Sequence, residues 1–378
     1  MEKQELQAWL RLTLSTGVGN ENSRKLLAAF GSVQAIFEQS PATLEQMGSA
    51  KLARAIQTKP PNLTAQLQMT LDWLQAGDDR RVVALGDTAY PSALLDIADP
   101  PLMLYLLGKQ TRLLDAPSKH SSSHLAIVGS RNPTPQGETN ARQFAKTLAG
   151  ANLCIVSGLA LGIDGAAHDG AMQAGGNTIA VVGTGLDRVY PKKHLELAHR
   201  IAQQGMLISE FPLGTPPLTA NFPKRNRIIS GLSLGTLVIE AALQSGSLIT
   251  ARLAAEQGKD VFAIPGSIHS PQSRGCHALI KQGAKLVETA QDVLEELNLP
   301  ARDTAECMPA VGEANPWPGS SSLAALTTAL GFDVVSLDTL QARTGIETPL
   351  LQAQLLELEL DGQVFRLPGG LFQRRADA

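Results

Sequence analysis

The 378-residue chain contains little cysteine and no long apolar run. Its three cysteines, Cys154, Cys276 and Cys307, form no Cys-x-x-Cys pair. This excludes a disulfide framework and a cysteine zinc site, and is typical of a reducing compartment. No apolar run is long enough to span a bilayer, and the residues that follow Met1 lack the apolar core of a signal peptide. We therefore expect a cytoplasmic protein without membrane contact.

The usual cofactor motifs are also missing. No Gly-x-Gly-x-x-Gly opens a helix, because Gly183 and Gly185 lack the third glycine, and neither Gly-Lys pair continues into the Ser or Thr of a P-loop. His269 and His277 flank Cys276 at a spacing that fits no usual zinc pattern. We expect no cofactor, neither NAD nor ATP, and no metal.

The sequence pattern divides the chain into five segments, since 378 residues are too many for one core. Residues 1–75 predict short helices joined by glycine-bearing turns, as in a SAM-like or helix-hairpin-helix domain. Such a domain either packs against its neighbour or binds the DNA backbone through turn amides. Residues 76–122 predict a connector with short strands, 123–297 the main domain, 298–320 a linker and 321–378 a small winged helix.

The main domain has six apolar runs that alternate with helical stretches. The runs are residues 125–128, 153–156, 178–182, 206–208, 236–239 and 261–264. Strands that are apolar on both faces and separated by helices indicate a parallel sheet covered on both sides. We predict an α/β protein with a central, extended Rossmann-like doubly wound parallel sheet. A helical N-terminal domain and a C-terminal winged-helix domain flank it.

The loops that follow these runs are suited to anions. In an open parallel sheet, ligands bind at the carboxyl ends of the strands. Glycines and hydroxyls at helix starts leave N–H groups for phosphate, and Arg131 adds a fixed charge. The net charge of −3 argues neither for nor against a nucleic-acid ligand, because binding depends on where basic residues cluster. The candidate residues in these loops are Gly129, Ser130, Arg131, Gly158, Leu159, Ala160, Gly185, Ser245, Ser247 and Thr250.

A basic stretch at residues 221–231 lies between the fourth and fifth runs. Arg and Lys neutralise phosphates, a Phe ring offers a face for an unstacked base, and Asn can hydrogen-bond that base. The alternative is a solvated helix start whose arginines pair with acids such as Glu210 or Glu240. The candidate residues in this stretch are Phe222, Lys224, Arg225, Asn226 and Arg227.

Together these motifs resemble the DNA-processing protein A family (DprA/Smf), nearly from end to end. The motifs are Gly129-Ser130-Arg131, residues 157–164, Phe222-Pro223 followed by residues 225–230, residues 245–251 and residues 263–266. Each alone is weak, whereas their order and spacing are specific. The resemblance implies a SAM-like domain, an extended Rossmann domain and a winged-helix tail.

The resemblance also implies a function without catalysis. Members bind incoming single-stranded DNA during natural transformation, protect it and load the recombinase RecA onto it. They form homodimers through the end of the Rossmann domain, here residues 275–297. Some relatives carry a lysine where this chain has Thr219, which puts one phosphate contact in doubt. By motif match, DNA would contact Arg131, Phe222, Arg225 and Arg227, with backbone or hydroxyl contacts from Gly129, Gly158 and Ser247.

The tail is poorly suited to duplex DNA. Its candidate recognition segment, residues 345–362, contains no Lys or Arg, and residues 321–378 hold four basic against seven acidic side chains. This balance favours a protein-interaction module.

An enzyme is the alternative to a DNA-binding protein. Residues 235–240 are similar to the Gly-Thr-x-x-Glu motif of lysine-decarboxylase-like phosphoribohydrolases, which process nucleotides, but Glu240 falls one residue late. Glu240 would otherwise orient Arg225 or Arg227. Asp164 and His168 share a helix face and either form an acid/base pair or make local structural contacts; we expect a helix cap and a local hydrogen bond.

Overall fold

The computed structural model describes residues 1–109, 123–299, 326–331 and 334–375. The predicted linker, residues 298–320, lies almost wholly outside the described residues, as does Cys307. The end of the predicted connector, residues 110–122, is outside them too.

Short helices build the N-terminal domain. They are α1 (Lys3–Leu14), α2 (Gly19–Phe30), α3 (Val33–Phe37), α4 (Pro41–Gln46), α5 (Ala50–Gln57) and α6 (Leu63–Gln75). The hydroxyls of Ser32, Ser40 and Ser49 cap α3, α4 and α5 by accepting a backbone N–H of the first turn. Because each cap stops one short helix from extending backwards, the chain turns repeatedly. The helices enclose a small core that includes Leu10 and Ile36.

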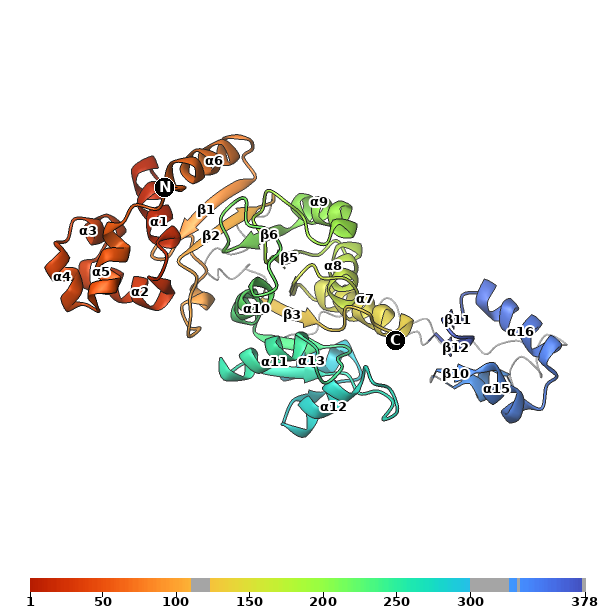
Figure 1. The fold of residues 1–378 in the computed structure, drawn as a ribbon. Coiled ribbons are helices and arrows are strands. Elements are labelled where there is room, and N and C mark those ends of the chain that lie inside the picture. The colour runs from red at the N-terminus through yellow and green to blue at the C-terminus, as the bar shows by residue number, and fades with distance from the viewer. Residues whose placement is uncertain (110–122, 300–325, 332–333, 376–378) are drawn as a thin grey trace.

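A nine-stranded sheet forms the centre of the molecule (Figure 1). Its order is β1-β2-β6-β5-β4-β3-β7-β8-β9, and the strands from β6 to β9 in this order run parallel. These are β3 (His124–Val128), β4 (Cys154–Ser157), β5 (Thr178–Val181), β6 (Met206–Ser209), β7 (Gly235–Val238), β8 (Asp260–Ala263) and β9 (Lys285–Leu286). The first six coincide with the six apolar runs, as predicted.

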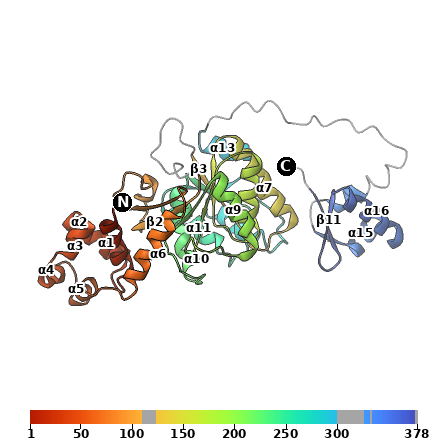
Figure 2. The same ribbon diagram turned by 90° about the horizontal axis from the view of Figure 1, so that it is seen from above.

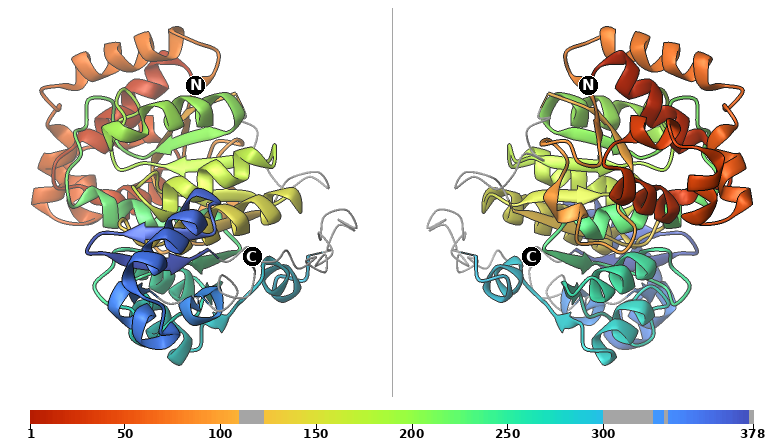
Figure 3. Two further views of the ribbon diagram at one scale, coloured as in Figure 1. Left: turned by 90° about the vertical axis from the view of Figure 1, so that its right-hand side faces the viewer. Right: turned by 90° about the vertical axis from the view of Figure 1, so that its left-hand side faces the viewer.

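Two strands of the predicted connector extend this sheet instead of lying apart from it. The strands β1 (Arg80–Ala84) and β2 (Met103–Leu107) pair antiparallel, and β2 pairs antiparallel with β6. The first four residues of β2 are buried, so the strand needs a neighbour on both faces and on both edges. Figure 2 shows the N-terminal helices beside this end of the sheet, and Figure 3 (right) shows them in front of it.

Helices cover both faces, which makes the sheet doubly wound. Alternate residues of β3 point to opposite faces: Leu125 and Ile127 pack with α7 (Pro135–Gly150), α8 (Ile163–Gln173) and α13 (Ala290–Glu296). Ala126 and Val128 pack with α10 (Asn221–Leu232), α11 (Ser247–Glu256) and α12 (Arg274–Lys281). The helix α9 (Leu195–Gln204) covers β5 and β6, and the short 3-10 helices η1 (Ser92–Leu94) and η3 (Lys192–His194) lie in loops.

The tail has the predicted winged-helix elements. They are β10 (Val335–Ser336), α15 (Leu337–Thr344), α16 (Thr348–Leu360), β11 (Val364–Leu367) and β12 (Leu371–Arg374). Ser336 caps α15, and β11 and β12 form a hairpin through Gly369 and Gly370, both with positive φ. Leu340, Leu355 and Phe372 form its core.

Candidate nucleic-acid interface at the topological switch point

The strand order reverses between β3 and β7. Successive strands β3 to β6 add towards one edge, whereas β7 to β9 add towards the other. The loops after β3 and β7 therefore separate and leave a crevice, which is the usual ligand position in such sheets. A cavity of about 420 Å³ lies there. Ten of the candidate residues line it: Gly129, Ser130, Arg131, Ala160, Phe222, Arg225, Asn226, Ser245, Ser247 and Thr250.

The loop after β3 is fixed through its backbone and leaves one charged side chain free. A Cβ added to Gly129 would lie 2.6 Å from Ile163 and 2.9 Å from the Glu240 carbonyl oxygen, so only glycine fits. The N–H of Ser130 donates to that carbonyl at 2.7 Å. Arg131 is exposed and has no ion pair with a described residue. Its guanidinium carbon lies 5.8 Å from the ring centre of Phe222.

The loop after β4 is closed by an acid. The Asp164 carboxylate accepts the N–H groups of Gly158 and Ala160 at 3.1 and 3.3 Å, so these amides are not free for phosphate. Asp164 thus binds the preceding loop, and the expectation that it caps its own helix is wrong. Burial raises its pKa, although Arg225 opposes the shift. Leu159 is fully buried, so the loop offers Ala160 alone to the cavity.

An aromatic pair lies beside the loop after β5. Phe222 packs over Gly183, and the Tyr190 ring lies 5.6 Å from the Phe222 ring at 35°. Tyr190 is 47% exposed. Sequence reasoning missed Tyr190, although an aromatic residue in a loop at a strand's carboxyl end was a usable signal. Gly185 is outside the cavity, and its N–H donates to Thr215.

The basic stretch forms the start of α10, and its three cations point in different directions. Lys224 is 48% exposed, whereas Arg225 is only 5% exposed. Arg225 donates to the carbonyl oxygens of Gly158 and Val181 beneath the loops. Burial lowers its pKa to about 10, with Asp164 opposing the shift. Asn226 accepts from Arg225 at 3.2 Å, and its amide donates to Gly246.

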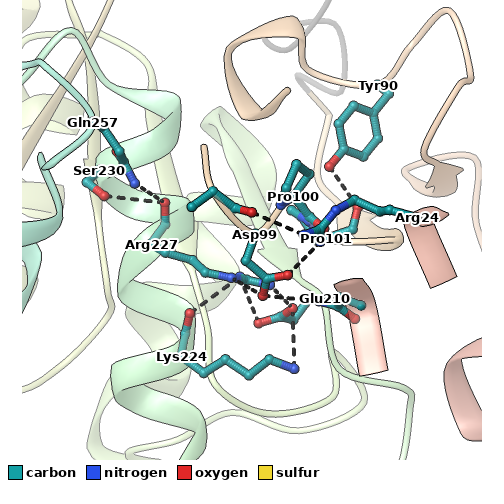
Figure 4. A network of polar contacts seen from close by, with 12 residues as sticks. Arg24, Tyr90, Asp99, Pro100, Pro101, Glu210, Lys224, Arg227, Ser230 and Gln257 are labelled. Atoms are coloured by element: carbon teal, nitrogen blue, oxygen red, sulfur yellow. Dashed lines mark hydrogen bonds and ion pairs between the residues drawn. The ribbon is translucent and has the colours of Figure 1, made fainter. Parts of the chain in front are cut away.

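Arg227 is turned away from the cavity. Its guanidinium donates to Glu210 at 2.6 Å and to Asp99 at 3.1 Å, and Lys224 lies 3.7 Å from Glu210 (Figure 4). The interpretation that an arginine of this stretch pairs with Glu210 is therefore confirmed. The DNA contact expected of Arg227 would require this buried pair to break.

The loop after β7 presents hydroxyl groups. Ser245 and Ser247 share a hydrogen bond of 2.7 Å between their side-chain oxygens, and α11 begins at Ser247. The first turn of α11 places Thr250 on the cavity wall, although Thr250 is almost fully buried. Gln244 and Asn132 also line the cavity and were missed, because isolated amide residues carry no pattern in the sequence.

Glu240 and His168 have structural partners. The Glu240 carboxylate accepts the N–H of Thr134 at 2.9 Å and its hydroxyl at 2.5 Å, so it secures the start of α7. The alternative in which Glu240 orients Arg225 or Arg227 is wrong, because its carboxylate is held by Thr134 and the two arginines have other partners. His168 has the expected local hydrogen bond, to Thr178 at 2.7 Å, and burial lowers its pKa to about 3.

The described residues contain neither a metal-binding cluster nor a membrane-spanning helix. Within them, no cluster of three or more His, Cys, Asp or Glu side chains could hold a metal ion. No helix there combines the length and the apolar character needed to cross a bilayer.

Family models match three parts of the chain. Residues 81–298 match the model of DNA recombination-mediator protein A. Residues 3–59 match a DprA-like N-terminal HHH domain, and residues 313–370 match a DprA winged-helix domain.

Relatives and solved structures agree with these models. The chain is 44% identical to protein Smf of Escherichia coli over 82% of this chain and 81% of that protein. It is 50% identical to DNA processing protein DprA of Streptococcus pneumoniae over 56% of this chain and 72% of the relative. The solved structure of S. pneumoniae DprA matches with a TM-score of 0.63 at 36% identity, covering 80% of this chain and 99% of the other.

A second solved structure concerns DNA directly. It describes the single-stranded DNA binding mode of DNA processing protein A from Helicobacter pylori. That structure matches with a TM-score of 0.51 at 32% identity, over 58% of this chain and 96% of the other. With a family model over more than half of its length and an Smf relative aligned over most of both proteins, this chain belongs to the DNA-processing protein A (DprA/Smf) family.

Proposed function

We propose that the switch-point cavity and the adjoining aromatic pair bind single-stranded DNA. One observation carries the proposal: the guanidinium of exposed Arg131 lies 5.8 Å from the partly buried Phe222 ring, which packs beside the exposed ring of Tyr190. Arg131 can pair with a phosphate while the rings receive unpaired bases. Because stacking on a side chain requires a base that is free of its partner strand, this arrangement favours single strands over duplex.

The charge of the cavity supports an anionic ligand. Its lining contains Arg131 and Arg225, and the acid in it, Asp164, is buried, feels the positive charge of Arg225 and accepts two backbone N–H groups. No acid of the lining is left to repel a phosphate. The H. pylori relative, whose solved structure concerns single-stranded DNA, supports the same ligand.

We further propose that the bound strand is protected and passed to the recombinase RecA, as in natural transformation, within the cytoplasm and without catalysis. The description of the family as recombination mediators supports this role. A homodimer through residues 275–297 remains our proposal. Support comes from β9, which lies at the edge of the sheet with Leu286 exposed.

The tail suits a protein partner. The exposed residues of α16 include Leu350, Leu356 and Leu360, with Glu357 among them, and α16 contains no cation. An apolar and acidic surface would repel phosphates, so we assign the tail to protein contacts.

The alternative, a nucleotide-processing hydrolase, has little support. Its catalytic candidate, Glu240, is held by Thr134 and does not line the switch-point cavity. A base or nucleophile in that position would have to release the start of α7 before it could act.

The test is a titration of the protein with labelled single-stranded and duplex oligonucleotides of equal length at two salt concentrations. Wild type and Arg131→Ala are compared, with Glu240→Gln as a control outside the cavity. We expect a salt-sensitive preference for the single strand that Arg131→Ala weakens and Glu240→Gln retains. Equal binding of both DNAs, or nucleotide hydrolysis that Glu240→Gln abolishes, would refute the proposal.

A further inference from the structure

One carboxylate lies where three parts of the chain meet. Asp99, in the loop between η1 and β2, accepts hydrogen bonds from Arg24 at 2.6 Å and Asn20 at 3.3 Å, both on α2. It also accepts one from Arg227 of α10 at 3.1 Å. Figure 4 shows Arg24 and Arg227 approaching this carboxylate from opposite sides. A single acid therefore joins the N-terminal domain to the helix that carries Phe222.

On the N-terminal side of this contact, the Arg24 guanidinium makes several hydrogen bonds to the loop that carries Asp99. Besides Asp99, Arg24 donates to the carbonyl oxygens of Ala98 at 3.1 Å and Pro100 at 3.4 Å. Arg24, which follows the glycine-bearing turn at the start of α2, therefore directs its hydrogen bonds to the central domain. The hydroxyl of nearby Tyr90 donates to Pro101 at 2.7 Å, which fixes the same loop from within.

The α10 side is buried more deeply. The side chains of Arg227 and its second partner, Glu210, are 10% and 5% exposed. A Cβ added to Gly231 would lie 2.8 Å from Leu94 and 2.9 Å from Ile97, so α10 lies directly on the segment that leads to Asp99. Contacts along one helix face thus hold α10 against this loop.

The charges favour an ionised Asp99. Burial alone would raise its pKa, but the hydrogen bonds and charges of Arg24 and Arg227 outweigh burial and leave the pKa below its ordinary value. Asp99 is therefore a carboxylate at neutral pH, as a bridge between two guanidinium groups requires.

We propose that Asp99 is a positioning residue that does not contact DNA. Through Asp99, the N-terminal helical domain holds α10 in place, and with α10 the Phe222 ring. Arg227 then acts as the receiving group on α10 and not as a phosphate contact. The predicted effect on DNA affinity rests on the proposed single-strand binding. The structural coupling between α2 and α10 does not depend on that function.

The direction in which Asp99→Asn changes DNA affinity distinguishes this proposal from a purely electrostatic effect. Asp99→Asn removes a negative charge and breaks the ion pairs that Arg24 and Arg227 make with Asp99. If these arginines reach DNA, or if charge alone matters, the variant binds single strands more tightly and with a steeper salt dependence. If Asp99 positions α10, the variant binds about 2- to 30-fold more weakly with an unchanged salt slope.

The matched control is Glu21→Gln, which removes one acid from the same helix as Arg24. Glu21 is 74% exposed and pairs only with Lys25 among the described residues. We expect wild-type affinity for this variant. Asp99→Glu should restore part of the lost affinity. Arg24→Ala added to Asp99→Asn should weaken binding by less than the sum of the two single changes, because both break the contact between Arg24 and Asp99.

The experiment combines this titration with hydrogen exchange of the DNA-free protein. Arg24→Ala should speed amide exchange in α10 (Asn221–Leu232), although Arg24 lies on α2, whereas Glu21→Gln should not. Exchange in α10 that stays at the wild-type rate would overturn the coupling whether or not the protein binds DNA. Should Asp99→Asn not fold, Arg24→Ala and Asp99→Glu give both readouts. Wild type that fails to bind single strands would refute the proposed function alone.

Discussion

The loop after β3 and the start of α10 both carry arginine to the switch-point cavity, yet they use it differently. Arg131 comes from a loop whose backbone is fixed by glycine packing and by the bond from Ser130 to Glu240. Its side chain is exposed and makes no ion pair with a described residue. Arg225 comes from a helix and is buried among carbonyl oxygens beside Asp164. The first can meet a ligand, whereas the second holds the loop that the ligand would touch.

The difference follows from geometry more than from charge. On a helix each residue turns about 100° from the last, so Lys224, Arg225 and Arg227 cannot all face one ligand. A rigid loop with one long side chain has no such restriction. A cluster of cations in sequence is therefore a weaker guide to a phosphate site than one cation on a well-fixed turn.

Arg225→Ala should have the largest effect, and the effect should be on the stability of the protein. It removes the buried positive charge that acts most strongly on Asp164 and the guanidinium that donates to the carbonyls of Gly158 and Val181, so we expect a loss of about 3–5 kcal/mol in the free energy of unfolding. Denaturant unfolding followed by circular dichroism measures it. Arg225→Lys keeps the charge and should lose less. Unchanged stability together with lost DNA affinity would mean that Arg225 contacts DNA directly.

Arg131→Ala should have the opposite profile. The loss of a charge-assisted phosphate contact should cost about 1.5–3 kcal/mol of single-strand binding, roughly 10- to 150-fold in Kd, with the free energy of unfolding unchanged. The slope of log affinity against log salt should fall by about 0.7. Fluorescence anisotropy at several salt concentrations measures both. Arg131→Lys should restore the wild-type salt slope. If Arg131→Ala keeps the wild-type slope, the phosphate binds at another residue.

Phe222→Ala tests the apolar part of the same site. Loss of base stacking should cost about 1–3 kcal/mol of binding and leave the salt slope unchanged, because no charge is removed. Phe222→Tyr keeps the ring and serves as the control in the same anisotropy assay. A change in slope for Phe222→Ala would show that the ring acts by placing Arg131 and not by receiving a base.

Lys224→Ala should have the smallest effect. The half-exposed Lys224 lies 3.7 Å from Glu210, a distance and exposure that make the pair worth less than about 1 kcal/mol of stability. Thermal unfolding should show almost no shift. If DNA affinity falls as much as in Arg131→Ala, Lys224 replaces the phosphate contact that Thr219 does not provide.

The sequence predicted the main elements because their signal is local. Short runs that are apolar on both faces became the six parallel strands, and most of the glycine and hydroxyl candidates after them line the switch-point cavity, Gly158 and Gly185 excepted. Strand order and pairing across the sheet are long-range properties. The strands β1 and β2 were therefore visible as strands, but their place beside β6 was not.

The directions of individual side chains were harder to predict. No pattern in the chain tells that Asp164 binds the amides before it, or that Arg227 finds Asp99, which lies 128 residues away. These contacts form only when the sheet brings distant loops together. Tyr190 belongs to the same class: its place beside Phe222 depends on the packing of two loops.

Photo-cross-linking to a single strand that carries 5-iodouracil, followed by peptide mapping, tests the central claim most directly. The account predicts that the cross-linked peptides contain Phe222 or Tyr190, and that Arg131→Ala lowers the yield. Cross-links confined to residues 1–75 or to the winged-helix tail would contradict it, since the strand would then lie away from the switch-point cavity.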